Sequence, residues 1–158
     1  MSVSASGLPV RTGAVAGGIA WIVGLVVTYA LLQLEVIGGA FGPLIGQTFG
    51  LVVFVFASLH LWPMLFGSGT TLSLFWTIVP LVIILGAGYV TADRTGGGVS
   101  AGATVAVGYF ALTVLSVIYF ISAFGQVDAI QMIAYLVVGG ALFPAVFGGL
   151  GGYVAEEL

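Results

Sequence analysis

Cysteine is absent from this chain, and so is lysine. Without a thiol there is no disulfide, no cysteine nucleophile and no cysteine-ligated metal. Apart from one histidine, the only basic side chains are Arg11 and Arg94. A basic surface for nucleic acid is therefore missing, and we expect no nucleic acid partner.

Charge is scarce as well, because 4% of the 158 residues are charged and 61% are hydrophobic. Soluble domains carry about 25% charged residues, so this chain could not cover a surface that faces water. We therefore predict an integral membrane protein in contact with membrane lipid. The net charge of −3 without any lysine indicates a salt-adapted organism, since carboxylates bind water and cations well.

Five apolar stretches are each long enough for a membrane-spanning helix, which needs about 20 mostly apolar residues. They cover about 13–33, 45–66, 72–91, 101–123 and 131–154. They are longer than the roughly 9–11 residues of a barrel strand, and they do not alternate polar and apolar residues. In hydrocarbon the backbone must satisfy its own hydrogen bonds, which leaves the helix. We predict an all-α integral membrane bundle of five transmembrane helices with short loops.

The connections between these stretches are short, and none has the character of a linker. Residues 1–158 are therefore expected to form a single transmembrane domain. The longest connection, 34–44, is half apolar and either lies along the membrane interface or dips inward as a re-entrant turn. Five crossings would place Arg11 and Arg94 on opposite sides, so the positive-inside rule gives no orientation.

Small residues recur at helical spacing in three of the stretches. Lipid offers helices no hydrophobic reason to associate, so close backbone approach at small residues must hold a bundle together. The predicted helix-packing positions are Gly13, Gly17, Gly24, Gly102, Gly140, Gly148 and Gly152. The preferred interpretation is tight packing of helices. The alternative is that these glycines expose backbone carbonyls to a pore.

Three prolines, Pro63, Pro80 and Pro144, fall inside the predicted spans. Proline cannot donate a backbone hydrogen bond, so each frees the carbonyl four residues earlier. The simplest interpretation is a packing kink, which membrane helices tolerate. The functional alternative is a hinge or a carbonyl ligand for an ion. Pro144 is the best candidate for it, because flanking glycines give the composition of a broken helix.

The single histidine, His60, follows an uncharged apolar run in the second span. It shares a helical face with Gly50, Val53 and Ala57, so we expect it to face other helices about 7–8 Å beyond the midpoint of the span. The preferred interpretation is a neutral imidazole, hydrogen-bonded across helices or toward headgroup water. The alternative is a proton relay, ligand contact or metal ligand. One histidine without cysteine provides too few ligands for a metal or haem, so we expect no cofactor.

Several segments resemble a known group of proteins. Residues 8–29 (LPVRTGAVAGGIAWIVGLVVTY), 101–110 (AGATVAVGYF) and 141–152 (ALFPAVFGGLGG) are similar to a group of small multi-pass membrane proteins of halophilic archaea, described only as a domain of unknown function. Residues 54–62 (FVFASLHLW) resemble a stretch of that group in which an aromatic run precedes a histidine. The resemblance implies a haloarchaeal cell membrane and brings no activity and no catalytic residues.

No catalytic site is evident, because the loops are too short for a catalytic domain and no carboxylate lies deep in a span. We therefore expect no enzyme. The sequence favours a structural or assembly component of the cell membrane, which packs against a second copy or a membrane-protein partner through its glycine faces. The alternative is a subunit of a small-solute or ion transporter or channel, with His60 and the proline-kinked helices lining a path. Replacing His60 would alter stability or assembly in the first case and the pH dependence of a flux in the second.

Overall fold

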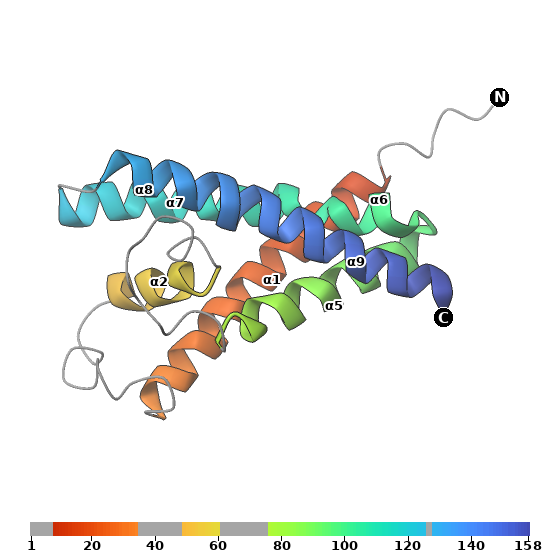
Figure 1. Cartoon of the computed structure of the whole chain (residues 1–158), viewed down its shortest axis with the longest axis horizontal. Helices are drawn as coiled ribbons and strands as arrows, with labels where there is room; N and C mark the ends of the chain where they lie inside the picture. Colours follow the sequence, from red (N-terminus) through yellow and green to blue (C-terminus); the bar gives the residue numbers. More distant parts are fainter. Residues whose placement is uncertain (1–7, 35–48, 61–75, 126–127) are drawn as a thin grey trace.

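A computed structural model describes residues 8–34, 49–60, 76–125 and 128–158 (Figure 1). All regular structure in these ranges is helical, which confirms the predicted all-α fold for them. In chain order the elements are α1 (Leu8–Gln33), α2 (Phe49–Ser58), α5 (Ile78–Thr95), α6 (Gly98–Ala103), α7 (Val105–Phe124), α8 (Ala129–Ala134), the π-helix η1 (Tyr135–Leu142) and α9 (Phe143–Glu157).

Four helical segments in the described part of the chain are long and apolar enough to cross a membrane. They are Pro9–Gln33, Ile78–Thr95, Gly98–Ser122 and Ala129–Glu157. The third predicted span ends later than expected, because α5 continues through Arg94 until Gly96 stops it in the left-handed conformation, with φ 65°. The part of that predicted span before residue 76 lies outside the described residues.

The second predicted span, 45–66, contains only the short helix α2 within the described residues. Its 10 residues extend about 15 Å, roughly half of the hydrocarbon thickness of a membrane. The expectation of five spanning helices is therefore replaced, for the described ranges, by four long helices and one short one. An apolar run predicts apolar surroundings, but it does not tell whether lipid or protein provides them. Pro63 and the connection after Leu34 lie outside the described residues.

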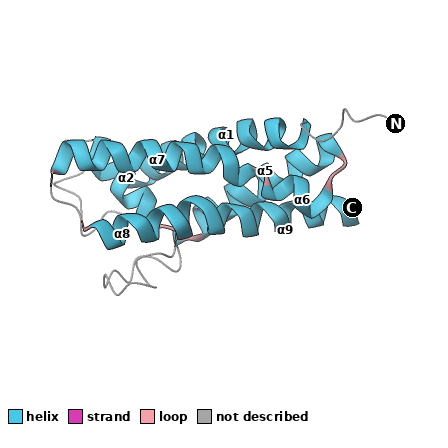
Figure 2. Cartoon of the chain, turned by 90° about the horizontal axis from the view of Figure 1, so that it is seen from above, coloured by secondary structure: helices cyan, strands magenta, loops and turns pink. Residues whose placement is uncertain are grey.

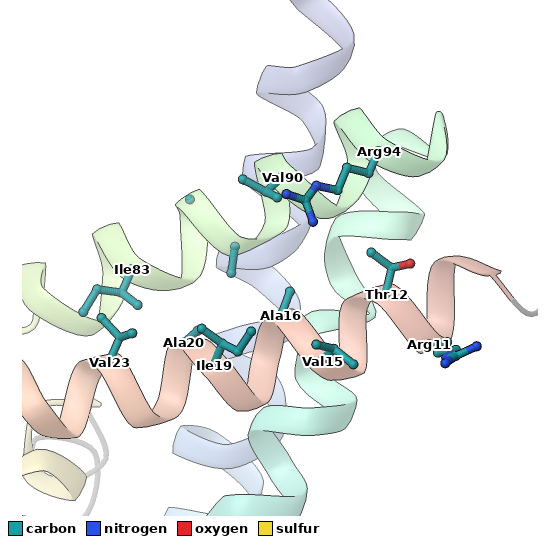
Figure 3. A pocket seen from close by; sticks show the side chains of 12 residues that line it. Arg11, Thr12, Val15, Ala16, Ile19, Ala20, Val23, Ile83, Val90 and Arg94 are labelled. Atoms are coloured by element: carbon teal, nitrogen blue, oxygen red, sulfur yellow. The ribbon is translucent and has the colours of Figure 1, made fainter.

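The two arginines lie at the same end of the bundle. Helices α1 and α5 run side by side in opposite directions, so the beginning of α1 with Arg11 meets the end of α5 with Arg94 (Figure 3). The end of α9 reaches this end too, where Glu156 lies against Gly98 (Figure 1). The prediction that the arginines lie on opposite sides is wrong, because the two long helices described between them, α1 and α5, run in opposite directions and bring the chain back to the same end.

The helices form a bundle. In Figure 2, α1 and α7 lie along one side, and the continuous run of α8, η1 and α9 lies along the other. In Figure 1, α2 and α5 lie along the lower edge of the bundle. Helix α5 packs against both α1 and α9. The core cluster draws Trp21 from α1, Phe56 from α2, Ile84 from α5, Tyr109 from α7 and Phe143 from α9.

Glycines occupy the closest approaches between helices. At each of the seven predicted packing glycines, an added Cβ would lie within 4 Å of atoms of a neighbouring segment. On α1, Gly17 faces the backbone carbonyl of Val105, and on α6, Gly102 faces that of Gly148. A side chain there would have to displace a whole backbone rather than a flexible neighbour.

Three further glycines of this kind are not among the predicted packing positions. A Cβ at Gly88, Gly108 or Gly151 would overlap a backbone carbonyl oxygen of another helix. A regular spacing marks one face of a helix, whereas α5, α7 and α9 each contact more than one neighbour. A search for one regularly spaced set of small residues therefore misses the glycines on the second contact face of each helix.

Of the three prolines predicted inside spans, the two that are described lie at the beginnings of helical segments. Pro80 is in the first turn of α5, where backbone N–H groups have no intrahelical partner, so it produces no kink inside a span. Pro144 follows Phe143 at the beginning of α9, directly after the π-helix η1. The N–H of Phe143 bonds to the carbonyl of Val138, five residues earlier, and the helix continues without a break. The broken helix considered from the sequence is thus a wider helical turn.

Candidate functional site

His60 lies directly after α2 and is completely buried, with an exposed fraction of 0%. Its imidazole packs against Tyr109 and Phe143. These two residues lie near the middles of Gly98–Ser122 and Ala129–Glu157. His60 is therefore deeper than expected from the sequence, because α2 ends inside the bundle instead of continuing toward its surface.

Both ring nitrogens of His60 form hydrogen bonds. Nδ1 lies 2.9 Å from the carbonyl oxygen of Phe56, and Nε2 lies beside the hydroxyl of Tyr109. A carbonyl oxygen can only accept, so Nδ1 carries the proton and donates it. Because the ring is completely buried among aromatic side chains, a charged imidazolium would be costly, so the imidazole is neutral and Nε2 accepts from the Tyr109 hydroxyl.

The side chain of His60 caps the end of its own helix. The last carbonyls of a helix have no partner within the helix. Here the Phe56 carbonyl accepts from the backbone N–H of Leu59 at 3.1 Å as well as from the imidazole, and the Ala57 carbonyl accepts from the backbone N–H of His60 at 3.2 Å. These bonds satisfy the carbonyls of Phe56 and Ala57 where the helix ends among apolar side chains.

Four aromatic rings surround the imidazole. The ring-centroid distances from His60 are 4.9 Å to Phe56, 5.3 Å to Phe143, 5.6 Å to Tyr109 and 6.3 Å to Tyr135. These rings come from α2, α7, η1 and α9, so the imidazole joins four segments. Aromatic pairs at such distances stabilise beyond the area they bury.

Buried hydroxyl groups lie next to the aromatic shell. The hydroxyl of Tyr135 lies beside the side chains of Thr113, Ser116 and Trp21. Thr113 donates to the carbonyl of Tyr109 at 2.9 Å, and Ser116 donates to the carbonyl of Thr113 at 2.7 Å. We refer to His60, Tyr109, Tyr135, Thr113 and Ser116 together as the His60 cluster.

The π-helix η1 brings its backbone close to the His60 cluster. A Cβ at Gly139 would lie 3.2 Å from the Cβ of His60 and 2.8 Å from the ring of Tyr135. One helical turn with an extra residue is often found at functional sites. In this chain the π-helix η1 places Gly139 next to the end of α2, where a larger side chain would not fit.

A family model described as "Family of unknown function (DUF7978)" matches residues 1–158. The chain belongs to this family. The match agrees with the resemblance to a group described only as a domain of unknown function. No curated protein and no solved structure matches the chain.

In this DUF7978 protein, the candidate positions from the sequence are brought together only in part. His60 and Pro144 meet indirectly, since Phe143 precedes Pro144 and packs on the imidazole. Pro80 instead begins α5. Tyr109 lies 49 positions away from His60, and no spacing in the sequence reveals such a hydrogen-bond partner. Among the described residues, no group of three His, Cys, Asp or Glu side chains could hold a metal ion.

Tyr109→Phe should destabilise this DUF7978 protein by about 1–3 kcal/mol, because it leaves Nε2 of His60 without a donor in a buried place. Tyr119→Phe on the same helix is the matched control, since Tyr119 is 36% exposed and should change stability little. Thermal unfolding of both variants in detergent measures the difference. Equal stability of the two variants would show that the His60–Tyr109 bond contributes nothing.

Proposed function

We propose that the chain is a multi-pass integral membrane protein of the cell membrane, with four crossings and the short α2 inside the bundle. Its four long helices have sufficient length and apolar character. Large apolar side chains cover the outside of the bundle, and Val15, Val26 and Ile118 are each more than half exposed, at 58%, 59% and 57%. Such a surface favours lipid over water.

The shared position of Arg11 and Arg94 supports an orientation. These are the only Lys or Arg residues of the chain, and both lie at the end where α1 begins and α9 ends. Positive side chains are enriched on the cytoplasmic side of membrane proteins. We therefore place this end in the cytoplasm. The acid excess and the absence of lysine support a haloarchaeal membrane.

Within that membrane, the function we propose is that of a non-catalytic structural or assembly component. The closed environment of His60 carries this proposal. Nδ1 of His60 donates to the carbonyl of Phe56, Nε2 accepts from the hydroxyl of Tyr109, and aromatic rings enclose the imidazole. An imidazole bonded in this way holds segments together and has no free nitrogen for a substrate. The partner would be a second copy or another membrane protein.

The composition of the protein in its native membrane tests this function. A tagged chain is extracted mildly at high salt, and the mass and polypeptide content of the complex are measured. We expect a complex of fixed stoichiometry, with either a second copy of the chain or a second polypeptide, and we expect His60→Ala to reduce its recovery. A homo-oligomer that conducts a solute or ion in liposomes would contradict the proposal.

A transporter or channel subunit for a small solute or ion is the second candidate, favoured by the end of α2 inside the bundle beside the π-helix η1. Interrupted helices at mid-membrane form substrate sites in many transporters. In liposomes that contain the purified protein, this candidate predicts a flux above that of empty liposomes. The flux should change in His60→Ala and persist in Tyr119→Phe. Absence of any flux from correctly folded protein would exclude it.

A further inference from the structure

A groove of about 900 Å³ runs along the outside of the bundle between α1 and α5 (Figure 3). Apolar side chains line most of its length, among them Val15, Ile19 and Val23 from α1 and Ile83 and Val90 from α5. Its volume is in the range of ligand sites, which is about 300–1,000 Å³. The groove therefore has the size and the apolar character for a hydrocarbon chain.

The only two arginines of the chain lie at one end of this groove. Arg94 reaches from α5 toward the space between the helices, and Arg11 is at the beginning of α1 beside Thr12 (Figure 3). Neither arginine forms an ion pair with a described carboxylate. An apolar groove with a cationic end is complementary to a molecule that has an apolar tail and an anionic head.

We propose that the groove binds an anionic phospholipid. One hydrocarbon chain lies along α1 and α5. The guanidinium group of Arg94 binds the phosphate with the Thr12 hydroxyl as a further donor, and Arg11 adds positive charge at the same end of the groove (Figure 3). Guanidinium groups bind phosphate through paired hydrogen bonds. Arginines at helix ends also lie at the depth of lipid headgroups. This inference rests on the proposed membrane location.

A free anion would not explain the groove, because most of the lining is apolar and the arginines occupy only its end. Gly86 contributes to the same lining, and an added Cβ there would meet nothing within 4 Å. A larger side chain at this position would fill the groove without disturbing helix packing. The lipid tail and the lipid head can therefore be tested by separate substitutions.

Native mass spectrometry of the delipidated protein in detergent tests the proposal, with phosphatidylglycerol and phosphatidylcholine of identical chains as probes. We expect phosphatidylglycerol to bind on the order of tenfold more tightly, because only its headgroup carries a net negative charge. Arg11→Gln combined with Arg94→Gln should remove this preference. Gly86→Leu should weaken binding of both lipids. Asp93→Asn, an exposed change of charge beside Arg94, is the control and should retain the preference.

Equal affinity for the two lipids would overturn the proposal, as would a preference that survives loss of both arginines. Soluble glycerol phosphate is the probe for the headgroup alone. If it binds as tightly as phosphatidylglycerol, the groove does not hold a lipid chain. Binding is measured on folded protein in detergent, so a negative result counts against the lipid site and not against the proposed membrane location. The latter is tested by whether the protein stays in the membrane pellet after an alkaline wash.

Discussion

Gly88→Ala should strongly destabilise the bundle although it adds only one methyl group. A Cβ at Gly88 would overlap the carbonyl oxygen of Gly148 on α9, so α5 and α9 would have to separate. Overpacking costs about 1–3 kcal/mol where side chains can move aside, and we expect at least the upper value here because backbone cannot. Thermal unfolding and size-exclusion chromatography in detergent measure the loss of folded protein.

Gly86→Ala is the matched control on the same helix. A Cβ at Gly86 would meet no atom within 4 Å, so nothing has to move. Alanine also favours the helix over glycine by about 1 kcal/mol. The variant should therefore equal or exceed the natural protein in stability. If Gly86→Ala and Gly88→Ala unfold at the same temperature, the close contact of α5 with α9 is wrong.

His60→Ala should reduce the free energy of unfolding by about 3–5 kcal/mol, within the range for large-to-small substitutions in a core. The substitution removes the donor to the Phe56 carbonyl and the acceptor of the Tyr109 hydroxyl, and it empties the centre of the aromatic shell. Leaving two buried polar groups without partners adds to the loss of packing. Unfolding in detergent at fixed salt measures the effect.

The contribution of the hydrogen bonds is separated by His60→Asn, which retains a donor near the position of Nδ1 and loses the acceptor for Tyr109. We expect a stability between those of the natural protein and His60→Ala. The double variant of His60→Asn with Tyr109→Phe should be less destabilised than the sum of the single changes, by about 0.5–3 kcal/mol. If His60→Ala were as stable as the natural protein, the interpretation that the His60 side chain caps α2 would be wrong.

The helical character and the interior face of α1 could be predicted from the sequence. In lipid, small residues mark the contact face, and the predicted positions Gly13, Gly17 and Gly24 are all buried. The length of α2 could not be predicted, because Leu51–Ala57 is apolar whether lipid or protein surrounds it. Counting 45–66 as a crossing placed Arg11 and Arg94 on opposite sides, so the groove that both arginines line could not be predicted.

The sequence predicts which way His60 faces, but it predicts neither the depth of His60 in the bundle nor its hydrogen-bond partners. The periodicity around His60 points it toward other helices, as the structure shows. Its depth depends on where α2 ends, and its bond to Tyr109 depends on how helices distant in sequence are arranged. The π-helix beside it gives no periodic signal, because Tyr135–Leu142 is apolar on every side and the change of face caused by an extra residue is not visible in such a segment.

The direction of each crossing can be measured directly because the chain contains no cysteine. Single substitutions Val10→Cys, Ile130→Cys and Leu158→Cys introduce thiols at exposed positions, which are 45%, 69% and 93% exposed. The probe is a membrane-impermeant thiol reagent added to vesicles of known orientation. We predict that Val10→Cys and Leu158→Cys react from the cytoplasmic side and Ile130→Cys from the other. Reaction of Val10→Cys and Leu158→Cys from opposite sides would contradict the four-crossing bundle and the internal position of α2.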